Sequence, residues 1–282
     1  MEEAVDRLLD FYLTTTRAAF KHLRAFPGQA PPGRFADLQD AFAWLDAEQA
    51  ILITAVAHAA AIQRHTHTTD IANCLVAYLS WQQPYTDWRT IAEHALNAYQ
   101  ALGDRRGEAM AWNDLGYARS DVGCLEAAVD AFEEARDIYR ELGDRRGEAE
   151  FWHNLGGTQS GFARNEAAID AYEKARDIYH DLGDLHGVAR SWRCLGLAQS
   201  GCLEAAVDAF EKARDVYREL GDRRGEAMSW HNLSVVVHEA GRVEEARAAA
   251  RQARQAYLDA GDPDGAAWVP DWGPAEHQAG IS

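Results

Sequence analysis

The sequence predicts an all-helical protein in which pairs of helices repeat along the chain behind a helical cap. The tripeptide Leu-Gly-Asp recurs at Leu102, Leu142, Leu182 and Leu220, with a degenerate copy at Ala260, so a unit of about 40 residues repeats. Apolar residues recur at helical spacing inside each unit. All seven prolines lie outside residues 85–262, so no helix breaker interrupts the array.

The first unit shows why each repeat is expected to form two helices. Asp104 is a good N-cap residue. Apolar residues then follow at helical spacing as far as about Ser120. Gly123 marks the turn between the two helices, and a second amphipathic helix is predicted from Leu125 to Leu142. Gly143 is expected to end that helix in the left-handed conformation.

Two parts of the array are nearly identical. Residues 123–156 align with residues 201–234 without gaps and differ at five positions, which indicates a recent duplication. Alignment of the third unit requires a deletion of two residues at Ser200-Gly201. We therefore expect this unit to have a tighter turn or a shortened first helix.

The spacing of certain residues, repeated from unit to unit, resembles that of the tetratricopeptide repeat. The first unit carries the pattern as Trp112, Leu115, Gly116, Ala128, Phe132 and Ala135, and the following units repeat it. The resemblance covers about residues 104–260 and implies a right-handed superhelix. It also implies that the first helix of each pair lines the concave face.

The remaining chain is divided by the same patterns. We expect helices at Glu2–Phe26, Phe35–Leu45, Glu48–Ile62, Asp70–Trp81 and Thr86–Leu102, with a Pro/Gly loop at Pro27–Gly33 and a polar turn at Gln63–Thr69. This predicts an N-terminal helical cap (1–69), an array (70–262) and a C-terminal tail (263–282). The array comprises a degenerate first pair (70–102) and repeats that start near residues 104, 144, 184 and 222.

The N-terminal part resembles the C-terminal arm of STAND-type transcriptional regulators of actinobacteria. The resemblance is carried by Arg7-Leu-Leu-Asp-Phe-Tyr12 and Ala41-Phe-Ala-Trp-Leu-Asp-Ala-Glu48, followed by the Leu-Gly-Asp array. In those regulators the repeats act as a sensor. This chain has no Gly-x-x-x-x-Gly-Lys-Ser/Thr loop. The resemblance therefore implies a sensor role, without the NTPase or DNA-binding activities.

The composition restricts partners and location. The chain has 28 Lys and Arg against 45 Asp and Glu, a formal net charge of −17, which argues against nucleic acid and anionic membranes as partners. No apolar run reaches the length of a membrane span, and no basic segment follows Met1. Together with only four cysteines, this predicts a cytoplasmic protein.

Polar side chains at the groove-facing positions of the first helices are the candidate binding residues. A carboxamide offers a donor and an acceptor and so matches a peptide group, whereas a pair of arginines can clamp a carboxylate. The alternative interpretation is an ordinary solvated concave face. The candidates are Asn113, Asp114, Tyr117, Glu150, His153, Asn154, Arg190, Arg193, His231, Asn232 and His238.

No catalytic, metal-binding or cofactor-binding motif is found in the sequence. His153 and His231 are copies two units apart, too distant to share a metal. We therefore predict a non-enzymatic binding scaffold or regulatory sensor that holds a peptide or protein segment. The alternatives are an enzyme or small-molecule receptor, such as one of bacterial specialised metabolism, and a detached regulator arm that acts on an NTPase in trans. An open polar groove favours a peptide, and a closed apolar pocket favours a small molecule. No oligomeric state is predicted.

Overall fold

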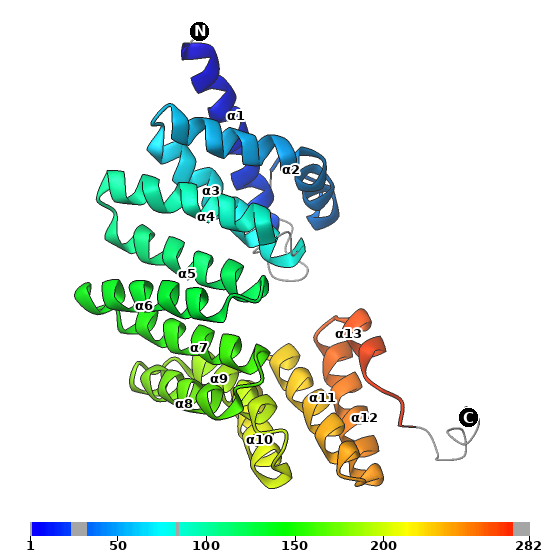
Figure 1. Cartoon of the computed structure of the whole chain (residues 1–282). Helices are drawn as coiled ribbons and strands as arrows, with labels where there is room; N and C mark the ends of the chain where they lie inside the picture. Colours follow the sequence, from blue (N-terminus) through cyan, green and yellow to red (C-terminus); the bar gives the residue numbers. More distant parts are fainter. Residues whose placement is uncertain (1, 24–32, 83–84, 273–282) are drawn as a thin grey trace, which may run out of the picture. The chain divides into compact units, whose positions relative to one another are not determined.

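The computed structural model describes residues 2–23, 33–82 and 85–272, and every regular element in these ranges is an α-helix (Figure 1). The all-α prediction is thus confirmed. The helices are α1 (Glu2–Leu23), α2 (Leu38–Ala61), α3 (His65–Gln82), α4 (Tyr85–Leu102), α5 (Arg105–Asp121), α6 (Leu125–Glu141), α7 (Arg145–Gly161), α8 (Asn165–Asp181), α9 (Leu185–Ala198), α10 (Leu203–Glu219), α11 (Arg223–Glu239), α12 (Val243–Asp259) and α13 (Pro263–Trp268).

The helices fall into two compact units, Met1–Asp144 and Arg145–Ser282. In the first unit α3 packs on α4, α4 on α5 and α5 on α6. In the second unit each helix from α7 to α13 packs on the next one along the chain. Each repeat is a helix pair, as the sequence predicts. Among the described residues no helix is both long enough and apolar enough to cross a membrane.

The recurring Asp caps the first helix of the following pair. Its carboxylate accepts the backbone N–H three residues on, at 2.8–3.0 Å. This contact is made by Asp104, Asp184, Asp222 and Asp262. The preceding glycine is left-handed, with φ of +67° at Gly143. The Leu-Gly-Asp tripeptide is therefore a helix stop followed directly by a helix start.

The cap aspartates Asp144, Asp184, Asp222 and Asp262 also contact a basic residue of the preceding repeat. The second basic residue of the first helix forms an ion pair with the next cap aspartate, as Arg146 does with Asp184 at 3.0 Å and Arg224 with Asp262 at 3.2 Å. His186 lies 3.8 Å from Asp222 in the same position. These contacts link successive pairs at the edge formed by the helix starts.

Glycine and an aromatic ring meet at the centre of three of the helix pairs, α5–α6, α7–α8 and α9–α10. A Cβ on Gly116 would lie 2.4 Å from the ring of Phe132, and a Cβ on Gly196 would lie 2.6 Å from that of Phe210. Both rings are fully buried. The small residue thus lets the two helices approach with a large ring between them.

The third repeat, formed by α9 and α10, differs from the other repeats in the turn between its two helices. Helix α9 has 14 residues, whereas α5, α7 and α11 have 17. Gly201 is not left-handed, although its counterparts Gly123, Ala163 and Gly241 have φ of +83°, +57° and +76°. The shortened-helix alternative predicted from the deletion is confirmed.

The recurring tryptophans lie only partly buried between helices. One face of each indole packs on the core, and cations cover another. Lys174 lies 4.2 Å from the ring of Trp152. Arg176 and Lys212 lie 4.6 and 4.5 Å from that of Trp192. Packing therefore accounts for the indoles, supplemented by cation–π attraction.

The predicted break between Phe35–Leu45 and Glu48–Ile62 is wrong. Helix α2 is continuous, starts at Leu38 and is capped by Asp37. Its buried stripe runs through Leu45, Leu52 and Val56, so Asp46 and Ala47 simply occupy the outer face of one helix.

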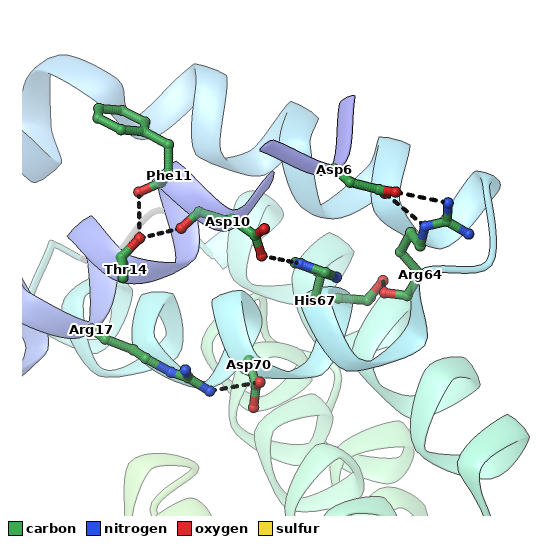
Figure 2. Close-up of polar contacts among 9 residues, drawn as sticks. Asp6, Asp10, Phe11, Thr14, Arg17, Arg64, His67 and Asp70 are labelled. Carbon is green, nitrogen blue, oxygen red and sulfur yellow. Dashed lines mark hydrogen bonds and ion pairs between the residues drawn. The ribbon is translucent and has the colours of Figure 1, made fainter. Parts of the chain in front are cut away.

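The predicted polar turn Gln63–Thr69 is also largely wrong, because α3 begins at His65. The polar residues here form ion pairs with α1: Arg64 bonds to Asp6 at 2.8 Å, His67 to Asp10 at 2.9 Å, and Arg17 to Asp70 at 2.7 Å (Figure 2). The polar residues of this segment therefore mark a contact between two helices and not a loop. Most of the predicted loop Pro27–Gly33, and the last residues of the helix predicted to end at Phe26, lie outside the described residues.

Candidate functional site

The predicted groove residues lie on the first helix of each pair. The second unit carries most of them: Glu150, His153 and Asn154 on α7, Arg190 and Arg193 on α9, and His231, Asn232 and His238 on α11. Asn154 is buried, Glu150 is exposed, and the other six are partly buried. Asn113, Asp114 and Tyr117 lie on α5 in the first unit.

Arg190 is held against a tyrosine of the preceding helix. Its Nη2 donates to Tyr179 Oη at 2.7 Å, and its guanidinium carbon lies 5.5 Å from the centre of the same ring. Its buried Nε has no hydrogen-bond partner among the described residues. A buried N–H of a cation without a partner is costly, so this atom is suited to an incoming acceptor.

His153 is the most perturbed imidazole of the groove. Its ring centre lies 5.4 Å from that of Tyr172. Burial, followed by the charges of Arg190 and Arg193, lowers the pKa of His153 to about 3. The ring is therefore neutral near pH 7. Its buried Nδ1 also has no partner within the described part of the chain.

Arg193 and Cys194 complete this cluster on α9. Arg193 hydrogen-bonds to Tyr217 on α10, and Cys194 to Tyr172 on α8. Burial raises the pKa of the Cys194 thiol, so it stays protonated and is a poor nucleophile. The structure thus brings together His153, Arg190 and Arg193 with tyrosines of two neighbouring helices, α8 and α10.

A small open cavity of about 220 Å³ borders this cluster. Six of its eight lining residues are ionisable groups of both signs and histidine, and the others are Gly187 and Tyr217. The ionisable residues are Arg146, Glu150, Asp184, His186, Arg190 and Asp222. The cavity is smaller than usual small-molecule pockets of about 300–1,000 Å³, which are mostly apolar.

The α5 residues form a separate group in the first unit. Burial raises the pKa of the Asp114 carboxyl to about 7. Tyr117 stacks on Trp88 with ring centres 6.0 Å apart and meets Phe132 edge-on at 5.5 Å. A carboxyl with a pKa near neutrality can accept or donate a proton at physiological pH.

The candidate residues on α11 have contacts of their own. Burial lowers the pKa of His231. His238 stacks face to face on Trp272, with ring centres 3.7 Å apart and planes inclined by 14°. One face of His238 is therefore covered by the C-terminal segment.

The tyrosines of the second helices are absent from the sequence-based candidates. Tyr179 and Tyr217, which bond to the groove arginines, each stand three residues before a Leu-Gly-Asp tripeptide. Tyr99 and Tyr139 occupy the same position in earlier units. This recurrence is the signal that could have identified them. Among the described residues no group of three His, Cys, Asp or Glu side chains is arranged to hold a metal ion.

The family follows from the sequence and agrees with this architecture. Residues 107–181 and 187–259, together more than half of the chain, match the tetratricopeptide repeat family model. The protein belongs to the tetratricopeptide repeat family. No curated protein matches the chain.

Several solved structures share the fold at low sequence identity. BtubC from P. vanneervenii is 16% identical, with 89% of this chain and 91% of that chain covered and a TM-score of 0.58. A Rap protein complexed with competence and sporulation factor is 12% identical, with coverages of 93% and 78% and a TM-score of 0.62. A STAND protein with a tetratricopeptide repeat sensor from Pyrococcus horikoshii is 15% identical, with a TM-score of 0.58. The match covers 94% of this chain but only 41% of that one.

Proposed function

We propose that this protein is a non-enzymatic scaffold that holds a peptide or protein segment in the groove formed by the first helices of its repeats. The observation that carries the proposal is the cluster around Arg190. It offers two cations, tyrosine hydroxyls, and the buried unpartnered atoms Arg190 Nε and His153 Nδ1 within the described residues. An extended segment supplies the acceptors and donors that such groups require.

The charges of the groove specify the partner further. The whole chain carries a formal charge of −17, yet Arg190 and Arg193 are close enough to act together on the pKa of His153. A segment with a carboxylate side chain or a free C-terminus would bind Arg190 and Arg193. Asn154 and Asn232 would hold its backbone, and Glu150 and His231 would flank it.

A regulatory role in a bacterial cytoplasm is the setting that we infer. The similar Rap structure holds a factor in complex, and the similar STAND protein carries its repeats as a sensor. The sequence features of residues 7–48 support a role as a sensor arm. The ionisable lining and small volume of the cavity at Arg190 favour a peptide over a small apolar ligand.

Selection of peptide ligands tests this function. A library of random peptides is displayed and selected on the full chain, and the affinities of the enriched peptides are then measured. Each net hydrogen bond lost is worth about 0.5–1.5 kcal/mol, so Asn154→Ala with Asn232→Ala should weaken binding by about 1–3 kcal/mol. Arg193→Ala should add a loss that shrinks with salt.

The matched control is Arg218→Ala, which removes an exposed arginine of α10 that pairs with Asp215. It should leave peptide affinity unchanged. Enriched peptides that bind the asparagine and arginine variants as tightly as the unaltered protein would refute groove binding. Melting curves of all variants establish that the fold is retained.

A further inference from the structure

The chain after α12 forms a short helix and then an extended segment that returns over the last repeat. Asp262 caps α13 (Pro263–Trp268), and Val269 then adopts an extended conformation with φ −68° and ψ 124°. We call residues 269–272 the strap. Val269 is buried, and Trp272 packs against the apolar clusters of α11 and α12.

The backbone of the strap is held by arginines of α12. Arg247 Nε donates to the carbonyl oxygen of Trp272. Arg254 Nη2 donates to the carbonyl oxygens of Val269 at 3.2 Å and Pro270 at 3.0 Å. These contacts recognise main chain and not side chains, so they do not depend on the sequence of the strap.

Comparison with earlier repeats explains why Arg254 does not stack on a tryptophan. Arg214 lies 4.6 Å from the ring of Trp230, the tryptophan of the following helix. Arg254 is the counterpart of Arg214 one unit later, but Pro270 stands where the next tryptophan would be. Proline also ends the helix, since the residue before it favours an extended backbone. Arg254 therefore binds carbonyl groups of an extended segment.

The strap itself is an imperfect occupant. Trp272 stacks on His238, but its buried Nε1 has no hydrogen-bond partner among the described residues. Asp271 is almost fully exposed, and its carboxylate lies 3.9 Å from Arg254. The strap is thus secured by one aromatic side chain, one buried valine and three main-chain contacts.

We propose that the face of α11 and α12 under the strap is a second peptide site, and that the strap is its internal occupant. The partner is an extended segment with an aromatic residue three positions after a branched apolar one, as in Val-Pro-Asp-Trp. Arg247 and Arg254 bind its backbone, and His238 stacks on its aromatic ring. A partner binds when it displaces the strap, so this site is distinct from the groove at Arg190.

A labelled peptide with the sequence of residues 266–272 tests the proposal on the full chain by fluorescence anisotropy. A tethered strap competes at an effective concentration in the millimolar range, so the unaltered protein should bind the peptide weakly. Trp272→Ala should release the site and tighten binding by at least about tenfold. Val269→Asp, which expels the other anchor, should do the same.

Two further variants make the result specific. Trp268→Ala removes the neighbouring tryptophan, which is 83% exposed, and should bind as the unaltered protein does. Trp272→Ala combined with Arg247→Ala should lose the gain. Asn154→Ala should have no effect here, which separates this test from that of the groove. The proposal is overturned if Trp272→Ala and Val269→Asp, both folded by circular dichroism, bind no more tightly than Trp268→Ala.

Discussion

Buried ionisable residues among the candidate binding residues make the stability of the fold depend on pH. The depressed pKa of His153, about 3, lies below the ordinary histidine value of about 6.5. Between these values the unfolded chain binds a proton that the folded chain does not. This residue therefore costs stability as the pH falls below about 6.5.

His153→Gln should consequently lessen acid sensitivity. Glutamine keeps a polar side chain but does not titrate, so the fall in Tm from pH 7 to pH 4 should be shallower than in the unaltered protein. Thermal melts across this range measure it. His180→Gln, at an exposed position on α8, is the control and should retain the original slope. Equal slopes for both variants would contradict the buried, neutral state of His153.

The pKa of Asp114 is raised, so its effect on stability has the opposite dependence on pH. Burial holds its pKa at about 7, above the unfolded value of about 3.9, so its contribution to stability is lost as the pH rises through this interval. Asp114→Asn should stabilise the protein at pH 8 by about 1–3 kcal/mol and have little effect at pH 4. Denaturant unfolding at the two pH values measures this. The exposed Asp130→Asn should show no such pH-dependent gain.

The site is predictable from the sequence only where one helix supplies it. Repeat register alone selects Arg190 and Arg193, because both lie on one face of a single helix. Tyr179 and Tyr217 come from the second helices, and their side chains meet the arginines only after neighbouring helices pack. The pKa values of His153 and Asp114 depend on burial, which the register does not give.

At the scale of helices and turns, local signals decide most of the fold. Cap and stop residues are repeated at each Leu-Gly-Asp, so these boundaries follow from the sequence. The wrong predictions, the break inside α2 and the polar turn before α3, lie in the N-terminal helices, which are not part of the repeated sequence. There polar residues such as Arg64 and His67 pair with α1, and such pairing cannot be distinguished from solvation by composition (Figure 2).

The turn between α7 and α8 carries a strain that can be removed. Ala163 is left-handed with φ +57°, where Gly123 and Gly241 serve in other units. A left-handed non-glycine residue costs roughly 1–2 kcal/mol, so Ala163→Gly should raise the free energy of unfolding by about 1 kcal/mol. The reciprocal change Gly123→Ala should lower it by a similar amount, since no atom crowds that site. A loss of stability in Ala163→Gly would contradict this account.

The molecule as a whole consists of units that contact mainly their neighbours in sequence. Stability in such arrays is approximately the sum of the repeats and their interfaces. Single internal repeats contribute without being individually indispensable.

The near-identity of residues 123–156 and 201–234 has a genetic consequence. A crossover between coding tracts that match as these protein segments do would delete residues 123–200. The new junction joins Val122 to Gly201, which is followed by Cys202 and α10 just as Gly123 is followed by Cys124 and α6. The product loses α6 to α9, with Arg190 and His153, but keeps α11 and the strap.

This shortened chain should fold, because α10 carries almost the same residues as α6 and can pack on α5 in its place. Circular dichroism should show a helical spectrum with a cooperative melt at a lower Tm, and deletion of residues 130–207, which joins the same two tracts at another point in register, should behave alike. A deletion longer by two residues, 123–202, also removes Gly201 and Cys202 before α10, so its product should melt at a lower Tm than the other two. Equal stability of the three products would show that register does not matter. Such a crossover would give a shorter chain that lacks the arginine cluster and keeps the strap.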